Sequence, residues 1–319
     1  QTPALHSLFD HANFVELILE APMDSATSGF VKEQIKTNGI TLSVHHGGHG
    51  APLILLHGYP QNHMCWSKVA PDLARDFHVI IPDLRGYGES EVVAADEEHR
   101  MYSKREMALD VAGVMDHFGI EKAHIAGHDR GARVAYRFAL DHPDRLDRLA
   151  ILEIVPTVDF WAAWDAELAM KAYHWTFLAQ PAPLPERMIA TDGPAYMDWT
   201  LASWTYAKDL SAFSDAALAA YRAQAADPAR IAAMCNDYRA GAFFDRGLDA
   251  EDRAAGRMIT APLCFLWAEA GFPARTGDPL GIWRAWAENV TGQAVANTGH
   301  FMPEEQPEAV LAALRAHFL

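Results

Sequence analysis

Short apolar runs alternate with helix-like stretches through the first half of the chain. The expected strands lie at 40–44, 53–56, 78–81, 123–126 and 149–152. The runs at 53–56 and 149–152 are wholly apolar, as in strands that are buried on both faces of a parallel sheet. The helices expected between the strands lie at 65–74, 104–118 and 132–141. This alternation predicts an α/β fold with a mostly parallel, doubly wound sheet.

The alternation stops near residue 156 and returns only after residue 250. The residues between are rich in Ala, Trp, Tyr and Met and are interrupted by prolines, which favours a series of helices. Strand patterns return at 262–267 and 293–296, and a last helix is expected at 307–319. A helical insertion between two strands of one sheet predicts a cap over the strand carboxyl ends, where ligands bind in open α/β sheets.

The pattern divides the chain into three parts. We expect an α/β core at 39–156 and 251–319, and a helical cap at 157–250. Residues 1–38 form an N-terminal extension, in which 14–19 has the spacing of a short amphipathic helix.

Composition and charge narrow the classes of partner. The 319 residues carry a net charge of −16, which argues against nucleic acid or an anionic membrane as a partner. No apolar run approaches the roughly 18 residues needed to cross a bilayer. Three cysteines, Cys65, Cys235 and Cys264, lie far apart, which predicts no disulfide framework and a cytoplasmic protein. We expect no metal or other cofactor, because His45, His46 and His49 lie in a Gly-rich turn without a carboxylate at ligand spacing.

The segment Gly127-His128-Asp129-Arg130-Gly131 carries the strongest chemical signal. It lies between an expected strand and an expected helix, which is the setting of a nucleophile elbow, with Asp129 where G-x-S-x-G has serine. A carboxylate is ionised at neutral pH and attacks a saturated carbon with a leaving group, forming an ester. This predicts displacement or epoxide chemistry. The structural alternative is that Asp129 only caps the helix that follows.

His300 follows the last expected strand and is the predicted base. The order nucleophile, acid, His is that of the α/β-hydrolases, and an imidazole can draw a proton from the water that hydrolyses the ester. A carboxylate should orient the imidazole. Glu153, directly after the strand at 149–152, is the first candidate, and Glu269, after the strand ending at Trp267, is the second.

Two further groups are expected beside Asp129. The loop His57-Gly58-Tyr59-Pro60 follows a predicted strand and should supply a backbone N–H, from Tyr59, to an oxyanion hole whose other donor is the N–H of Arg130. Arg130 and Arg133 share a helix face and form a candidate fork for a substrate carboxylate. The alternative is an ion pair with Asp83 or with an acid of the cap.

Several longer motifs extend this pattern. They are HGYPQNHMCW at 57–66, DLRGYGES at 83–90, GHDRGARVAYR at 127–137, YHWTFLAQPAPLPE at 173–186, LASWTYAKDLSAF at 201–213, MCNDYRAGAF at 234–243 and GHFMPEE at 299–305. From about Gly39 to the C-terminus the chain resembles the fluoroacetate (haloacetate) dehalogenases, which are α/β-hydrolases with a cap. The cap motifs are the more specific part of this resemblance, because the elbow is shared by a large superfamily.

The resemblance implies a role for each matching residue. Asp129 would be the nucleophile, His300 the base and Glu153 the acid, although Asp is expected in this family at the position of Glu153. The implied substrate is a small anionic haloacid, and a homodimer is implied as well. The implied binding residues are Arg130 and Arg133 for the carboxylate, His174, Trp175 and Tyr238 for the halide, and Trp204 for the cavity wall.

The sequence leaves two other functions open. An epoxide hydrolase shares the Asp nucleophile and the His base, and His174 with Tyr238 would protonate the opening oxygen. Arg130, Arg133 and Trp175 favour the dehalogenase, because an epoxide needs neither a carboxylate fork nor a third halide donor. The other possible function is that of a non-catalytic ligand receptor with the same fold. The presence of Asp129 and His300 disfavours it.

Overall fold

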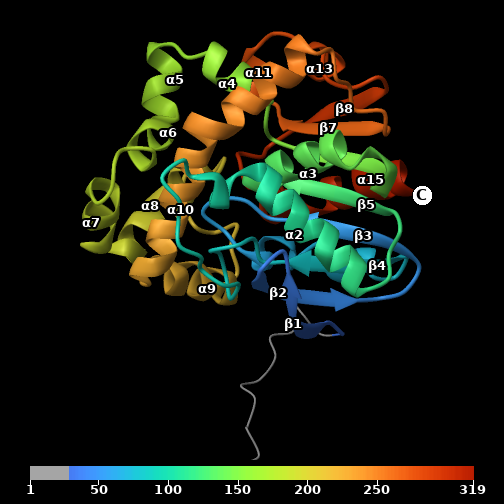
Figure 1. Cartoon of the computed structure of the whole chain (residues 1–319), viewed down its shortest axis with the longest axis horizontal. Helices are drawn as coiled ribbons and strands as arrows, with labels where there is room; N and C mark the ends of the chain where they lie inside the picture. The colour runs from blue at the N-terminus through green and yellow to red at the C-terminus, as the bar shows by residue number, and fades with distance from the viewer. Residues whose placement is uncertain (1–28) are drawn as a thin grey trace, which may run out of the picture.

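The computed structural model describes residues 29–319, so the helix expected at 14–19 lies outside the described residues. Eight strands form one sheet in the order β1-β2-β4-β3-β5-β6-β7-β8 (Figure 1). Their bounds are β1 (Val31–Thr37), β2 (Ile40–Gly47), β3 (Ala51–Leu56), β4 (Phe77–Pro82), β5 (Ala123–His128), β6 (Leu146–Leu152), β7 (Leu263–Ala268) and β8 (Val290–Val295). β2 pairs antiparallel with both β1 and β4, and the other neighbouring strands are parallel. The predicted fold class, a mostly parallel α/β sheet, is confirmed.

Helices cover both faces of the sheet. In β3, the side chains of Ile54 and Leu56 belong to the apolar core that includes α2 (Lys104–His117) and α3 (Arg130–Asp141). Leu53 and Leu55 belong to the core on the other face, with α1 (Ala70–Leu73) and α15 (Pro307–Phe318). Successive side chains of a strand point to opposite faces, so a wholly apolar strand is buried on both.

The expected helix at 65–74 is divided in the structure. It is replaced by η2 (His63–Trp66) and α1, which are separate short elements. The other elements of the core are η3 (Arg100–Tyr102), η4 (Pro143–Arg145), α12 (Phe272–Arg275), α13 (Pro279–Arg284) and α14 (Met302–Glu305). Within residues 29–319, no helix has the length and apolar character needed to cross a membrane.

Seven residues that we assigned to the N-terminal extension at 1–38 belong to the sheet. They form β1, whose Ile35 is paired with Leu42 of β2. Asn38 and Gly39 connect the two strands with φ angles of 43° and 76°. Asn-Gly is the preferred pair for a two-residue hairpin turn that needs positive φ at both positions. The extension expected at 1–38 therefore includes an edge strand.

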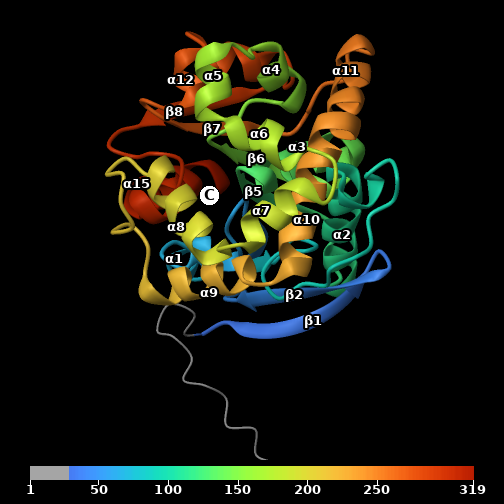
Figure 2. The same cartoon turned by 90° about the vertical axis from the view of Figure 1, so that its left-hand side faces the viewer.

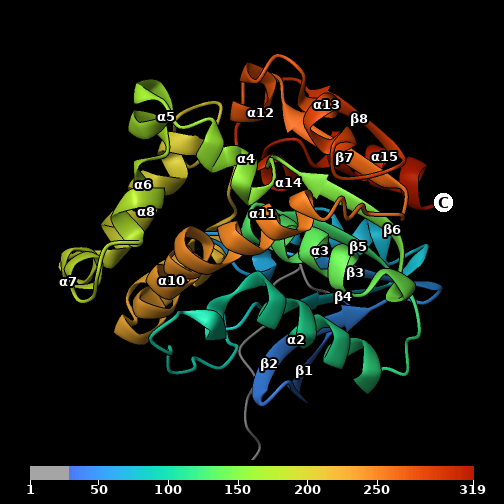
Figure 3. The ribbon, with the colours of Figure 1, turned by 45° about the horizontal axis from the view of Figure 1, so that its top comes forward.

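Every element between β6 and β7 is helical. These elements are α4 (Thr157–Ala162), α5 (Ala166–Lys171), α6 (Tyr173–Leu178), α7 (Leu184–Ala190), α8 (Gly193–Trp204), α9 (Asp215–Ala225), α10 (Pro228–Ala240), the π-helical segment η5 (Gly241–Asp245) and α11 (Arg246–Ala254). Figure 2 shows several of them in front of the central strands, and Figure 3 shows α10 and α11 as one long rod that runs from the cap toward α3. α11 continues past residue 250, where we placed the end of the cap.

Candidate active site

Asp129 lies at a sharp turn between β5 and α3. Its φ and ψ are 48° and −116°, a conformation that is costly for a residue with a side chain. The close packing around the turn requires glycine, because a Cβ at Gly131 would lie 2.3 Å from the His57 oxygen and a Cβ at Gly58 would lie 2.5 Å from the Asp129 Cβ. The Asp129 side chain makes no capping hydrogen bond to α3. The helix-cap alternative is therefore wrong, and the carboxylate is available for chemistry.

The two oxygens of the Asp129 carboxylate have different surroundings. The Tyr59 N–H donates a hydrogen bond of 2.8 Å to Oδ1. Arg130 is the first residue of α3, so its own N–H is not used within the helix. Oδ2 lies 3.6 Å from Nε2 of His300. Oδ1 is thus held by the predicted oxyanion loop, and Oδ2 faces the predicted base.

Charge keeps the Asp129 carboxyl ionised. Burial alone would raise its pKa, but the positive surroundings, to which the Arg130 and Arg133 guanidinium groups contribute at neutral pH, hold the pKa below its ordinary value. The residue is only 6% exposed. A buried carboxylate that stays ionised is weakly hydrated and therefore suited to attack carbon.

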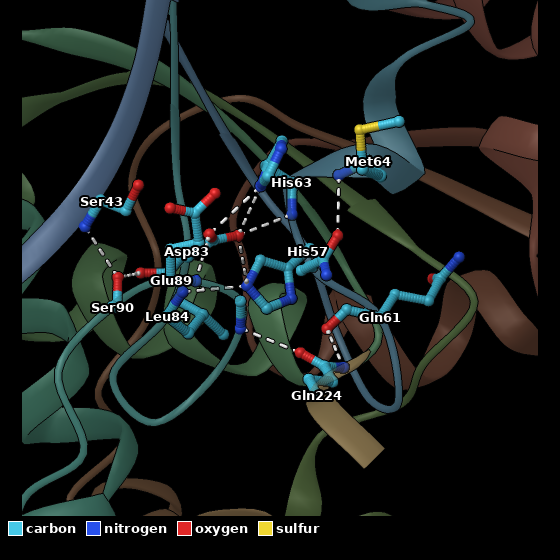
Figure 4. Close-up of polar contacts among 12 residues, drawn as sticks. Ser43, His57, Gln61, His63, Met64, Asp83, Leu84, Glu89, Ser90 and Gln224 are labelled. Carbon is cyan, nitrogen blue, oxygen red and sulfur yellow. Dashed lines mark hydrogen bonds and ion pairs between the residues drawn. The ribbon is translucent and has the colours of Figure 1, made fainter. Parts of the chain in front are cut away.

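A buried polar cluster, which our sequence reasoning missed, holds the loop that carries Tyr59 (Figure 4). Nε2 of His57 accepts a hydrogen bond of 2.9 Å from the Leu84 N–H, and Asp83 Oδ1 accepts from the N–H of His63 at 2.8 Å. Burial would raise the pKa of Asp83, but His63 beside it holds that pKa below its usual range. Asp83 thus anchors the start of η2, which follows the oxyanion loop, and pairs with a histidine instead of with an arginine.

His300 presents a free nitrogen to Asp129. Nε2 is buried without a hydrogen-bond partner in the described structure. Burial lowers the pKa of His300, against the attraction of the Asp129 charge. The imidazole is therefore neutral at pH 7 and its lone pair is available to take a proton. Nε2 of His128 donates to the His300 carbonyl at 2.7 Å, which fixes the backbone of this residue.

Glu153 lies at the end of β6 but does not reach His300. It is buried with a φ of 60°. Its Oε2 accepts a hydrogen bond of 2.5 Å from the Ala268 N–H, and a Cβ at Gly271 would lie 2.1 Å from its Oε1. Within the described residues, it forms no hydrogen bond or ion pair with His300, although both line one cavity. Glu is one methylene longer than Asp, so its carboxyl reaches the backbone at the last residue of β7.

The environment also changes the charge of Glu153. Burial raises the pKa of its carboxyl to about 8, against the opposing hydrogen bond from Ala268. The group is then mostly protonated at pH 7. Glu269, the second candidate acid, is exposed and is not among the residues that line the cavity. Glu153 is therefore the better placed of the two.

Arg130 is paired with an acid of the cap, which is the alternative that the sequence left open. Its Nη2 lies 2.5 Å from Oδ1 of Asp237, and its Nε donates to Oδ2 at 3.1 Å. The guanidinium also lies over the Tyr238 ring at 4.3 Å. Only Nη1 of Arg130 lacks a partner in the described structure. Asp237, and not Asp83, is the ion-pair partner of Arg130. Of the two arginines expected to bind a substrate carboxylate together, Arg130 is therefore already paired.

Arg133 is a buried cation in the cavity wall that has no acidic partner within residues 29–319. It is 2% exposed, and its Nη1 donates to the Val155 oxygen and the Thr157 hydroxyl at 3.1 and 2.9 Å. In residues 29–319 it forms no ion pair, and its Nε has no hydrogen-bond partner. A buried charge without a counter-ion is costly, so an anion that entered the cavity would stabilise this guanidinium.

The cap places several aromatic residues over Asp129. His174 and Trp175 are on α6, Tyr238 is on α10 and Trp204 ends α8. Nδ1 of His174 and the hydroxyl of Tyr238 are buried without a partner in the described structure. Burial lowers the pKa of His174 to about 3 and raises that of Tyr238 well above its ordinary value. Both groups are thus neutral at pH 7, and the Tyr238 hydroxyl keeps a proton to donate.

A cavity of about 610 Å³ is lined by most of these groups. The predicted site residues that line it are Asp129, Arg133, Glu153, His174, Trp175, Trp204 and His300. Arg130 and Tyr238 pack against Trp175 and are not among the lining residues. In the described part of the chain, no group of three or more His, Cys, Asp or Glu side chains is arranged to hold a metal.

The chain resembles known hydrolases over most of its length. Residues 51–307 match the family described as having the alpha/beta hydrolase fold. Fluoroacetate dehalogenase from Burkholderia sp is 37% identical over 287 residues, which cover 90% of this chain and 93% of that enzyme. Soluble epoxide hydrolase from Corynebacterium sp. (strain C12) is 35% identical over 280 residues, or 87% of this chain and 93% of that enzyme.

A solved structure supports the same fold. The structure of a proposed α/β hydrolase from Nostoc sp PCC 7120 superimposes with a TM-score of 0.88 and 44% identity, and the match covers 92% of this chain and 99% of that one. The chain therefore belongs to the α/β-hydrolase family. Within that family it is related to fluoroacetate dehalogenase, as the sequence motifs predicted, and also to epoxide hydrolase.

Proposed function

We propose that the protein is a hydrolytic dehalogenase that acts on haloacetates and releases halide and glycolate. The observation that carries this proposal is Arg133, a buried guanidinium without an acidic partner in residues 29–319 that lines the same cavity as Asp129. A guanidinium binds a carboxylate with two parallel hydrogen bonds, and Arg133 Nε is unpartnered. A 2-haloacid has its carboxylate one carbon away from the bond that must break.

The first step forms an ester on the enzyme. With the substrate carboxylate on Arg133, Oδ2 of Asp129 attacks the α-carbon from the side opposite the halogen. The new bond joins Oδ2 to carbon, and the halide leaves with the electrons of the carbon–halogen bond. Holding both reactants in one orientation lowers the entropy cost of this displacement. Asp129 needs no base for this step, because its carboxyl is already ionised.

The halide leaves into the aromatic part of the cap. Fluoride is a poor leaving group and a strong hydrogen-bond acceptor, so it needs donors that strengthen as charge develops. The Tyr238 hydroxyl and the Nδ1 side of His174 have no other partner in the described structure. The indole of Trp175 lies beside Tyr238, with ring centroids 5.6 Å apart. We assign these three side chains to the halide.

The second step hydrolyses the ester. Nε2 of His300 takes a proton from water while the water oxygen attacks Cγ of Asp129. Negative charge develops on Oδ1, which already accepts the Tyr59 N–H. Collapse breaks the bond between Cγ and Oδ2, and His300 returns the proton to the departing glycolate oxygen. The carboxylate that remains on Asp129 contains one oxygen from water.

Epoxide hydrolysis is the second candidate, and two observations favour it. The unpartnered Tyr238 hydroxyl would protonate the oxygen of an opening epoxide as readily as it would hold a halide. The similarity to the Corynebacterium epoxide hydrolase supports this reading. Arg133 is the feature against it, because a neutral epoxide leaves that charge without a counter-ion.

The test compares the two classes of substrate, haloacetates and an epoxide, directly. The purified protein is incubated with fluoroacetate, chloroacetate and styrene oxide in parallel, and released fluoride and chloride are measured with ion-selective electrodes. The proposal expects halide and glycolate in equal amounts and little or no diol. Diol without halide would assign the protein to the epoxide hydrolases, and no product from any of the three would remove both candidates.

A further inference from the structure

The loop that carries His300 is held by a single carboxylate, that of Glu305. Oε2 of Glu305 accepts a hydrogen bond of 2.9 Å from the Gly299 N–H, and Oε1 accepts one of 2.9 Å from the Phe301 N–H. The two donors are the residues immediately before and after the predicted base. A hydrogen bond to a charged acceptor is stronger than one between neutral groups. The carboxylate therefore fixes the backbone of His300 from both sides.

The same carboxylate also binds the cap. Its Oε2 accepts a third hydrogen bond, of 2.7 Å, from the N–H of Tyr206, which follows α8. The His300 N–H donates in turn to the Trp204 carbonyl at 2.9 Å. The contact is close, because a Cβ at Gly299 would lie 2.3 Å from that carbonyl. The base loop and the end of α8 are thus joined twice, directly by the bond between His300 and Trp204 and through the carboxylate of Glu305.

Within the described structure, no other contact of the Glu305 carboxylate suggests a different role. It forms no ion pair with a Lys or Arg in residues 29–319, and it is not among the residues that line the cavity. All three of its hydrogen-bond donors are backbone N–H groups of the base loop and the cap. The arrangement is that of a residue that positions another one.

We propose that Glu305 is a positioning residue that holds His300 opposite Asp129 and makes its placement depend on a docked cap. This inference rests on the proposed two-step reaction. Only the second step uses Nε2 of His300, and the first uses Asp129 and Arg133. Loss of the Glu305 contacts therefore slows ester hydrolysis and leaves ester formation largely intact.

The test is a rapid-mixing experiment with chloroacetate on full-length variants. Glu305→Gln keeps the size of the side chain but replaces one accepting oxygen with a donor that opposes an N–H. The matched control is Glu308→Gln, which changes an exposed glutamate three positions further along the chain. We expect Glu305→Gln to release a burst of one chloride per site, followed by a steady-state kcat about 10- to 100-fold below that of the wild type. The control should behave as the wild type does.

Two further readouts separate positioning from simple loss of folded protein. The enzyme stopped during turnover should carry the mass of one carboxymethyl group on Asp129 in Glu305→Gln, and much less of it in the wild type. The apparent pKa of the acid limb of kcat should also shift in Glu305→Gln and not in Glu308→Gln. Glu305→Asp, which keeps the charge but shortens the reach, should fall between the wild type and Glu305→Gln.

The outcomes that would overturn the inference are distinct. A burst amplitude that falls in proportion to kcat, with no ester and an unchanged pH profile, would mean only fewer folded sites. A Glu305→Gln enzyme with wild-type kcat and pH profile would also reject it. If the wild type itself releases no halide and forms no adduct, the proposed function has failed, and the fault does not lie with Glu305.

Discussion

Nε2 of His300 lies 3.6 Å from Oδ2 of Asp129, which is beyond hydrogen-bond distance. At this separation the two groups can act on one bound molecule in turn. Because no hydrogen bond joins them, neither group occupies the reacting atom of the other. Asp129 stays a free carboxylate for attack on carbon, and His300 stays neutral because its burial lowers its pKa. The same separation places the base beside the ester that the first step forms.

Replacing the base should stop the reaction halfway. We expect His300→Asn to form the ester on Asp129 at a rate near that of the wild type and to hydrolyse it at least 100-fold more slowly, in keeping with the loss of a general base. Intact-protein mass spectrometry after addition of chloroacetate should show one carboxymethyl group. His49→Asn, at an exposed position, is the control. Normal turnover by His300→Asn would show that the base is misassigned.

Removing the cation should affect binding of anions selectively. We expect Arg133→Met to raise KM for fluoroacetate by roughly 100-fold, because a charged hydrogen bond to a buried carboxylate contributes about 3 kcal/mol. KM for a neutral probe such as styrene oxide, or Kd if it is only bound, should change far less. Arg284→Met, which changes an exposed arginine, controls for the loss of one positive charge. Equal changes in KM for fluoroacetate and for the neutral probe would show that Arg133 does not bind the substrate carboxylate.

The protonation of Glu153 gives a prediction about pH. Its pKa of about 8 means that the carboxyl is mostly neutral at pH 7, so Glu153→Gln should keep kcat within about threefold of the wild type there. Above pH 8 the wild-type carboxyl ionises, and its negative charge, on the wall of the same cavity as His300, favours the imidazolium that forms in the second step without a direct contact. The two kcat profiles should therefore separate between pH 8 and 9, with the wild type higher. Glu269→Gln should follow the wild type throughout.

The opposite result for Glu153 is equally clear. A loss of 100-fold or more in Glu153→Gln at pH 7 would mean that the carboxylate is ionised and paired with His300 during the reaction. The side chain would then have to leave the Ala268 N–H that it binds in this structure.

Glu304 gives a prediction about stability. Its carboxyl is buried beside Gln61 and lies 3.2 Å from the Tyr221 hydroxyl, and burial raises its pKa from 4.5 to about 8. Between these two values the folded state holds a proton that the unfolded state has lost. The stabilisation is thus fully present below pH 4.5 and is lost as pH rises to about 8, with a slope of about 1.4 kcal/mol per pH unit.

Urea unfolding at pH 6, 7, 8 and 9 tests this linkage. The free energy of unfolding of the wild type should fall more steeply with pH than that of Glu304→Gln, whose amide cannot ionise. Glu308→Gln should run parallel to the wild type, because that glutamate is exposed in the folded state too. Parallel curves for Glu304→Gln and the wild type would show that Glu304 is ionised in the folded protein.

Local patterns were enough to predict the central strands and the elbow. The wholly apolar runs at 53–56 and 149–152 are strands, and the glycines around Asp129 mark the turn that the structure shows. β1 was missed because only Ile35 and Thr37 of its seven residues are buried, so its apolar signal is weak. The Asn38-Gly39 pair after it is a hairpin signal that would have located this strand.

Contacts between residues that are far apart in the sequence could not be predicted from local patterns. The ion pair between Arg130 and Asp237 joins residues 107 positions apart, and no local spacing indicates it. The side-chain direction of Glu153 depends on the free N–H of Ala268, which only the packing of β6 against β7 reveals. Hydrogen bonds to backbone N–H groups, such as those of Glu305, leave no trace in residue type.

The origin of the product oxygen tests the central claim most directly. Excess enzyme is allowed a single turnover of chloroacetate in H₂¹⁸O, and the glycolate and the peptide containing Asp129 are analysed by mass spectrometry. Attack by Asp129 on carbon predicts unlabelled hydroxyl oxygen in glycolate and one ¹⁸O in the Asp129 carboxylate. Label in the glycolate hydroxyl and none in the peptide would mean that water attacks the substrate directly, and it would contradict the account.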